Sequence, residues 1–424
     1  MGTFFSLEVL TAGEGDCLLV HWGAGRAIAV VDGGPAKTFE TTLRPRLDQI
    51  RRNRALDTLE LDLVMVSHVD NDHIVGIRKL FQELRRDETS ARPKIERPFL
   101  AKRLWHNAFS DILGTQFDDY YKPTTTAALT AAVSQGSARD FAAAGLDGIA
   151  GGERHDLALV LAGHADGRTL RDDYKLLFDA GCIQRLNAPF SRDGEPSPLM
   201  LTSASTETKI SDLTLLVTGP SEAELRKLQT DFEKFLVDKG LGVPAALMAA
   251  AGQQDSSPTN LSSVVCLLEF GGRTVLLTGD ALGRRILNGL RQAKLLKDGP
   301  LHVNVLKVPH HGSARNVDEE FFAAITADTY VFSADGKHGN PDRETIEWLV
   351  GSRDKHDEYR LVFTYPLVRI DEVRRKIHEG KEKVWDADRH GLEALIATYQ
   401  ADGFAFSCSA GPTVIDLGDE RLTD

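Results

Sequence analysis

The chain has 424 residues, of which 42% are hydrophobic and 26% are charged, an ordinary composition for a globular protein with a large core. Its formal net charge of −12 opposes broad, non-specific attraction to nucleic acid, although metal ions bound to acidic side chains would reverse the sign locally. No apolar run approaches ~18 residues and the N-terminus lacks a basic region, so the sequence predicts neither a membrane span nor a signal peptide. The 4 cysteines are scattered, which favours reduced thiols and a cytoplasmic location.

The first 110 residues are expected to be rich in strands and then to alternate strand and helix. Apolar runs predict strands near residues 4–10, 17–22, 27–31 and 63–66. A helix is expected around 38–52, and another over 74–86, where apolar residues recur at helical spacing.

The remainder of the chain divides into three parts. Residues 111–210 read as a partly helical insertion, which either caps the site or only packs against the domain. The fold then resumes with a strand at 213–217, a helix at about 221–239 that begins with a capping box, and further elements up to about 350. Residues 351–424 are expected to add strands near 360–365, 404–408 and 413–417 and helices near 369–380 and 390–401.

Metal-binding residue types gather directly after the apolar run at 63–66. Residues 68–73 read His-Val-Asp-Asn-Asp-His, so two imidazoles and two carboxylates occupy one turn. Imidazole nitrogen and carboxylate oxygen are the usual protein ligands of zinc, manganese and iron. His68, Asp70, Asp72 and His73 are therefore predicted to bind metal.

Two later turns supply the same kinds of side chain. Asp280 follows the apolar run 274–277, and His310 and His311 follow the run 303–306. Turns at the carboxyl ends of neighbouring strands can meet at one edge of a sheet. Residues 26–34 (RAIAVVDGG) and 273–280 (RTVLLTGD) also resemble one another, which favours a sandwich built from two similar halves.

Together these motifs resemble the metallo-β-lactamase fold. More narrowly, they resemble the branch typified by the soluble hydrolase domain of the ComEC DNA-uptake channel. Further agreement comes from Gly13-Glu14-Gly15-Asp16, Asp32-Gly33-Gly34 and Asn260-Leu261-Ser262-Ser263. The resemblance covers residues 1–110 and 255–350. It implies an α/β fold, an αββα sandwich over 1–350 with the insertion at about 111–210, and an α/β extension at 351–424 packed on it.

The resemblance also implies two divalent metal ions, zinc or manganese, in one site. Carried over to this chain, His68 and Asp70 serve one ion, Asp72 and His73 serve the other, and Asp280 bridges them. Most of the broader superfamily has histidine where this chain has Asp70, and the carboxylate favours a harder ion such as manganese or magnesium. Asp16 and Asp32 are expected to orient ligands and loops rather than to touch metal.

Two histidines keep more than one interpretation. His106, after an expected strand at 99–103, is either the remaining ligand of the first ion or an ordinary histidine, in which case Asn107 could face inward. His338 lies near the place where relatives carry a Gly-His-Pro turn, which here has Asn340 in place of the histidine. It is either a substrate contact or a turn residue.

The adjacent histidines at 310 and 311 cannot face the same way if the preceding strand continues through them. His311 is predicted to bind metal, and His310 is predicted to meet the scissile phosphate or the leaving group. The two roles could be exchanged.

The function predicted from these residues and the resemblance is metal-dependent hydrolysis of a phosphodiester, with nucleic acid or a nucleotide as substrate. Asp72, His310 and His338 are the catalytic candidates, with Asp72 also a metal ligand. One alternative is a hydrolase of a small cyclic nucleotide or ester. Another is an effector subunit whose site is activated by a protein partner bound to the insertion or to the C-terminal extension.

Overall fold

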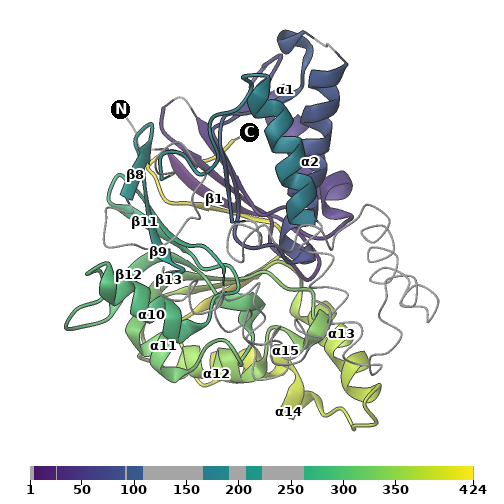
Figure 1. The fold of residues 1–424 in the computed structure, drawn as a ribbon. Helices are drawn as coiled ribbons and strands as arrows, with labels where there is room; N and C mark the ends of the chain where they lie inside the picture. Colours follow the sequence, from purple (N-terminus) through teal and green to yellow (C-terminus); the bar gives the residue numbers. More distant parts are fainter. Residues whose placement is uncertain are drawn as a thin grey trace, which may run out of the picture.

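Two β-sheets form the centre of the molecule (Figure 1). The computed structural model describes residues 4–24, 26–90, 93–107, 166–190, 207–221 and 262–423. The stretch 111–165 of the predicted insertion and nearly all of the helix predicted at 221–239 lie outside these residues. Within them, no helix is both long enough and apolar enough to cross a lipid bilayer.

The six-stranded sheet has the order β16-β1-β2-β3-β5-β7. Except for the edge strand β16, its strands are short and almost wholly buried, which explains why they read as continuous apolar runs. A separate pair, β4 (Leu59–Leu61) and β6 (Phe99–Ala101), lies beside it. The bounds are β1 (Phe5–Val9), β2 (Leu18–Trp22), β3 (Ala27–Val31), β5 (Leu63–Val66), β7 (Leu104–His106) and β16 (Thr413–Asp416).

The eight-stranded sheet has the order β15-β14-β13-β12-β11-β10-β9-β8. It is antiparallel from β8 to β11 and parallel from β11 to β15. The bounds are β8 (Glu207–Ile210), β9 (Leu213–Gly219), β10 (Val265–Phe270), β11 (Arg273–Leu277), β12 (Leu301–Lys307), β13 (Ile325–Phe332), β14 (Arg360–Phe363) and β15 (Ser407–Ala410).

Helices cover the outer face of each sheet, while side chains of both sheets share one buried cluster between them. In Figure 1, α1 and α2 lie on one side of the sheets and α10 to α13 with α15 on the other. This mixed α/β architecture agrees with the predicted class. The bounds are η1 (Phe39–Leu43), α1 (Arg44–Asn53), α2 (Asn71–Thr89), η2 (Lys94–Glu96), α10 (Gly283–Gln292), η4 (Pro309–Gly312), α11 (Glu319–Ala324), η5 (Lys337–Gly339), α12 (Arg343–Gly351), α13 (Leu367–Glu379), α14 (Ala387–His390) and α15 (Leu392–Ala401).

Helix α2 differs from its prediction in a way that matters for the site. It begins at Asn71 instead of Ile74, so Asp72 and His73 lie in its first turn. Asp70 precedes the helix with extended backbone angles, φ −67° and ψ 146°. A carboxylate in the first turn is favoured by the free N–H groups at a helix N-terminus, which explains the earlier start.

The described part of the insertion packs against α2. A helix over 166–179 buries Leu170 and Leu177 in the same cluster as α2. Arg78 of α2 pairs with Asp166 at 3.0 Å, and Arg85 pairs with Asp173 at 3.0 Å. This part of the insertion therefore acts as packing on the outer face.

The C-terminal segment 351–424 contributes strands to both sheets. Strands β14 and β15 extend the eight-stranded sheet in parallel, whereas β16 pairs antiparallel with β1. The sequence predicted an extension packed on the domain, and the segment is in fact hydrogen-bonded into it. Its short strands carry no signal for which sheet they join, because pairing partners lie far away in the chain.

Candidate metal centre

The three turns that the sequence singles out meet at one edge of the sheets. His68 follows β5, Asp280 follows β11, and the two adjacent histidines follow β12. The carboxyl ends of β3 and β5 point the same way because the two strands run parallel, and the same holds for β11 and β12. The first turn of α2 completes this edge.

Asp72, His73, Asp280 and His311 form the first group of possible ligands. The Nε2 atoms of His73 and His311 are 3.3 Å apart, and each lies 3.4 Å from an oxygen of Asp280. Asp72 Oδ2 is 3.4 Å from His311 Nε2 and 3.8 Å from His73 Nε2. Ligand atoms at the usual zinc distances in a tetrahedral site are ~3.4 Å apart, so these spacings suit an ion held between them.

A second group of donors lies on the other side of Asp280. His68 Nε2 is 3.5 Å from Asp70 Oδ2 and 3.8 Å from Asp280 Oδ2. His310 Nε2 is 3.6 Å from the same Asp280 oxygen. Within the described residues, His68 Nε2 and Asp280 Oδ1 are buried and make no hydrogen bond. A buried polar atom without a partner is costly, and a divalent ion shared through Asp280 would satisfy both.

Hydrogen bonds on the far side of the rings orient His68 and His73. His73 Nδ1 donates to Asp32 at 2.9 Å, and His68 Nδ1 lies 3.0 Å from Ser67 Oγ. Because the Ser67 hydroxyl donates to Asp32 at 2.7 Å, its lone pairs are left to accept from His68. Both rings thereby keep Nε2 for a metal, and Asp32 has the orienting role that the sequence suggested.

The adjacent histidines are oriented in the same way. His311 Nδ1 donates to the Ser333 carbonyl at 2.8 Å, and His310 Nδ1 donates to Asn316 Oδ1 at 2.8 Å. The amide of Asn316 is itself fixed, since its Nδ2 donates to the Asp280 carbonyl at 3.1 Å. All four imidazoles therefore direct Nε2 toward Asp280.

The charges of the cluster depend strongly on one another. Burial by itself would lower the pKa of His73 and of His311, but Asp280 and other carboxylates raise both well above their usual value. Burial would raise the pKa of Asp72 and Asp280, but the two imidazoles hold both below the usual range. Protons thus occupy the places where metal ions would bind, and metal binding would displace them.

Asp16 lies behind the histidines. Donor atoms of Asp16, His73, Asp280 and His311 all fall within 4.8 Å of one another. Even so, Asp16 faces His311 Nδ1 at 3.5 Å, and its oxygens are taken by Lys307 Nζ at 2.6 Å and by the Ser333 hydroxyl. These contacts suit the orienting role that the sequence suggested for Asp16. The fully buried Lys307 that neutralises it was not singled out from the sequence.

An unusual turn explains how neighbouring histidines both reach the site. Strand β12 ends at Lys307, so strand alternation does not govern the residues that follow. His310 and His311 adopt φ values of +46° and +56°, and Gly312 follows at +86°. The His311 side chain is 4% exposed and that of His310 is 21% exposed. Non-glycine residues in this region are uncommon and concentrate at functional sites.

Close backbone contact fixes α2 against the strand β3. A Cβ atom on Gly76 would lie 1.9 Å from the carbonyl oxygen of Gly33, and one on Gly33 would lie 2.4 Å from the Ile77 nitrogen. Only glycine permits this approach. The contact holds the first turn of α2 beside Asp32.

His106 does not join either group. It ends β7 and is buried beside Gly167 and Val69, where burial and then Arg171 lower its pKa to about 3. In the part of the chain that the structure describes, no ion pair joins it to Asp70 or Asp280. Within the described residues neither of its ring nitrogens has a hydrogen-bond partner, and a role as a ligand stays a prediction.

His338 lies at the mouth of the site. It occupies the turn η5 at φ +61° and lines a cleft together with Asp70 and Asp72. Burial and then Lys337 lower its pKa. Asn340, which stands in place of the expected histidine, donates its amide to the His310 carbonyl at 3.3 Å and so supports the turn.

The cleft has a volume of about 790 Å³. Its floor consists of Asp70, Asp72, Asp280 and His310, and its wall comes largely from α13, α14 and the segment between them. Six arginine and lysine side chains line it, against two carboxylates outside the metal cluster. The cleft therefore suits an anionic substrate.

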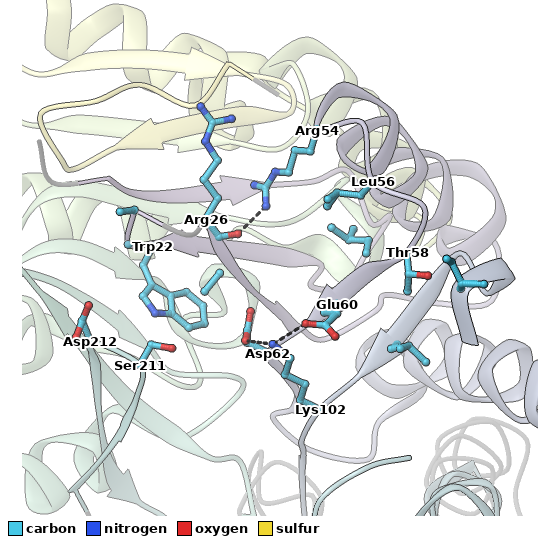
Figure 2. A pocket seen from close by; sticks show the side chains of 16 residues that line it. Trp22, Arg26, Arg54, Leu56, Thr58, Glu60, Asp62, Lys102, Ser211 and Asp212 are labelled. Carbon is cyan, nitrogen blue, oxygen red and sulfur yellow. Dashed lines mark hydrogen bonds and ion pairs between the residues drawn. The ribbon is translucent and has the colours of Figure 1, made fainter. Parts of the chain in front are cut away.

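A second cavity, of about 760 Å³, lies at the opposite end of the six-stranded sheet (Figure 2). Trp22 and Asp62 line it, at the ends of β2 and β5 that point away from the metal centre. Lys102 is paired there, at 2.9 Å from Glu60 and 3.0 Å from Asp62.

No protein-family profile matches the chain, and no curated protein matches it by sequence. Among solved structures, the metallo-beta-lactamase fold protein YhfI from Bacillus subtilis is similar over 97% of this chain and 99% of its own, at 10% identity and a TM-score of 0.32.

Proposed function

We propose that this protein is a metal-dependent phosphodiesterase of the metallo-β-lactamase fold that uses two divalent ions, zinc or manganese. The observation that carries the proposal is the pair of donor groups that share Asp280. In each group, Nε2 atoms and carboxylate oxygens face one another at 3.4 to 3.8 Å. Such a set of atoms is poorly suited to direct hydrogen bonding and well suited to metal binding.

The residues divide into ligands and a substrate contact. Asp72, His73 and His311 would hold one ion, His68 and Asp70 the other, and Asp280 both. Two ions at ~3.5–4 Å would polarise the phosphoryl group and lower the pKa of a water molecule. In this assignment Asp72 acts through the metal and not as a separate acid or base.

His310 is the best candidate to act on the substrate. Its Nδ1 proton is committed to Asn316, and its Nε2 faces the cleft beside Asp280. From there it can hold a phosphoryl oxygen or move a proton to the leaving oxygen. His338 lines the same cleft and is proposed as a second substrate contact.

A phosphodiester is favoured over an uncharged ester by two arginine side chains of the cleft. Arg343 and Arg374 lie on it although the whole chain carries a net charge of −12. Each of the two is held by a carboxylate, Glu347 and Asp371, at 2.8 and 3.0 Å, so their guanidinium groups are fixed in place. Fixed cations around acidic metal ligands match a substrate with phosphate groups on both sides of the scissile bond.

The test is metal analysis combined with hydrolysis of bis(p-nitrophenyl) phosphate by the full chain. Wild type should contain close to two ions per chain and should hydrolyse the substrate with added zinc or manganese. Asp280→Asn should lose both properties, whereas Asp212→Asn, a matched change in the cavity of Figure 2, should keep them. Wild-type protein that binds only a trace of metal would overturn the proposal.

A further inference from the structure

One wall of the metal cleft is both basic and aromatic. The C-terminal wall, defined here as residues 374–390, runs from the second half of α13 through α14. Its basic members in the cleft are Arg374, Lys381, Lys383 and Arg389. The proposed hydrolysis of a phosphodiester uses the floor of the cleft with Arg343 and Arg374, so the lysines, Arg389 and the aromatic side chains of this wall are left without a role.

We propose that the C-terminal wall binds a single-stranded nucleic acid beside the scissile bond. Lysines of the wall would contact successive phosphates, and Trp385 would stack on an unpaired base. This inference rests on the proposed function and adds the class of substrate to it.

Three of the four basic side chains of the wall are available to a ligand. In the part of the chain that the structure describes, no ion pair involves Lys381 or Lys383. Arg389 meets Asp386 only at 3.9 Å, with its side chain 82% exposed. This differs from the cavity of Figure 2, where Lys102 is held between two carboxylates. Cations without a nearby acid contribute most to phosphate binding.

Trp385 is placed to receive a base. Its ring is half-buried and packs against His378, with centroids 5.6 Å apart, and His390, with centroids 5.3 Å apart. The guanidinium of Arg374 lies 5.7 Å from its centroid. These neighbours hold the indole at the cleft and leave part of it open. Stacking of a base on such a ring stabilises binding by about 1–3 kcal/mol.

The wall is fixed relative to the metal centre. Arg374 donates to the carbonyl of Gly339, next to His338, at 3.0 Å, and to the carbonyl of His390 at 2.7 Å. Arg343 of α12 donates to the carbonyls of Asp388 and Gly391, at 2.9 and 3.0 Å. A ligand on the wall therefore has a set position relative to the catalytic floor, which a loosely attached segment could not provide.

A single strand fits these features better than a duplex. The bases of a duplex already stack on one another, so their faces are not available to an indole. A mononucleotide would leave most of the lysines and arginines without a phosphate. A chain of several unpaired nucleotides uses both the basic and the aromatic side chains.

The test measures binding and cleavage separately. Binding of a fluorescein-labelled single-stranded oligonucleotide of about 12 nucleotides is followed by anisotropy with the EDTA-treated full chain. Trp385→Ala should weaken binding about 5- to 150-fold, and Trp385→Phe should restore most of it. Lys381→Gln with Lys383→Gln should weaken binding and reduce the slope of log Kd against log salt by about 1.4, since each phosphate contact on a single strand contributes about 0.7.

The matched control removes two charges of α13 that lie outside the cleft. Arg375 and Lys376 are exposed and do not line the cleft, so Arg375→Gln with Lys376→Gln should leave binding unchanged. In the metal-loaded protein, the wall variants should raise KM for the oligonucleotide. Their hydrolysis of bis(p-nitrophenyl) phosphate, which has no base or chain, should equal that of wild type.

The outcomes separate the two proposals. Suppose that wild type hydrolyses bis(p-nitrophenyl) phosphate and that the wall and control variants bind the oligonucleotide equally well. This result would reject nucleic-acid binding by the C-terminal wall and would leave the proposed phosphodiesterase activity intact. A duplex that binds as tightly as the single strand, with the same loss in Trp385→Ala, would overturn the choice of a single strand. Absence of hydrolysis in wild type would instead reject the proposed function, while anisotropy would still report on the wall.

Discussion

The two large cavities lie at opposite ends of the six-stranded sheet and have similar volumes, about 790 and 760 Å³. At the far cavity, shown in Figure 2, opposite charges meet at ordinary ion-pair distances, and Arg54 donates to the Arg26 carbonyl at 2.6 Å. At the metal edge, carboxylate oxygens and imidazole Nε2 atoms face one another at 3.4 to 3.8 Å, beyond most hydrogen bonds. Size does not distinguish the cavities, whereas the arrangement of polar atoms does.

The same contrast holds for buried histidines. His21, near the far cavity, lies 3.3 Å from Glu8, and burial lowers its pKa. His311, at the metal edge, has a raised pKa because Asp280 and Asp16 outweigh its burial. His21 has a single acidic partner, Glu8, and needs no metal ion to balance its charge. The other is surrounded by more acid than one proton can neutralise, which agrees with its proposed role as a metal ligand.

The largest difference in metal content and hydrolysis is expected when one histidine is replaced at the metal edge and another near the far cavity. His311→Ala should lose metal and reduce hydrolysis to the uncatalysed level, because it removes an Nε2 atom that faces three other donors. His21→Ala should keep both metal content and hydrolysis. Elemental analysis and turnover of a chromogenic diester measure both variants, and full metal content in His311→Ala would break the comparison.

His310→Ala should keep the metals and slow turnover about 10²–10⁴-fold, the usual weight of a group that moves a proton or polarises a phosphate. The reason is its position: Nδ1 is committed to Asn316 and the exposed side of the ring lines the cleft. Loss of metal equal to that in His311→Ala would instead make it a ligand of the second group. Asn316→Ala, which frees the ring, should give a smaller loss in the same direction.

Stability should respond differently to two lysine substitutions. Lys307→Met leaves Asp16 as a buried charge without its partner 2.6 Å away, and should lower the free energy of unfolding by about 3–5 kcal/mol. Lys102→Met removes a partly exposed pair at the far cavity and should cost at most about 1 kcal/mol. Denaturant titration measures both. A double variant, Lys307→Met with Asp16→Asn, should recover part of the loss, and no recovery would contradict the pairing.

The smallest expected effect is the pH dependence of metal affinity, with the release of protons when metal binds. Because the pKa values of His73 and His311 are raised above 6.5, these rings keep their protons to higher pH, and metal must compete for them. Affinity for zinc should therefore fall as the pH decreases, with release of on the order of one or two protons per chain on binding. Calorimetry in buffers of different ionisation enthalpy counts them. His21→Gln should not change the count, because the lowered pKa of His21 keeps it neutral there.

Much of the metal edge follows from local patterns. Apolar runs followed by His68, Asp280 or the adjacent histidines identify strand ends, and parallel strands bring such ends together. The ion pair between Lys307 and Asp16, which lies behind the metal-binding histidines, could not be predicted from such local patterns. Lys307 reads as the last residue of a strand, and its partner Asp16 lies almost three hundred residues earlier. A buried ion pair of that kind has no periodicity.

Local sequence patterns also could not predict the backbone conformation of the turn that carries His310 and His311. The alternation rule applied to His310 and His311 assumes that β12 continues, and the strand ends before Pro309. The C-terminal wall was missed for a similar reason. Trp385 and its neighbouring histidines looked unremarkable in sequence, because only the packing of α13 against η5 brings them to the cleft.

The pairing of β16 with β1 has a consequence for how the protein is made. Ser6 donates its hydroxyl to Asp416 at 2.8 Å, across 410 positions of sequence. On the ribosome, β1 therefore emerges long before the strand that covers its edge, and an open strand edge invites wrong partners. Contacts of such range slow folding. We expect the nascent chain to need protection until residues 413–416 have left the exit tunnel, and a variant lacking them to aggregate during synthesis even when its metal ligands are all present.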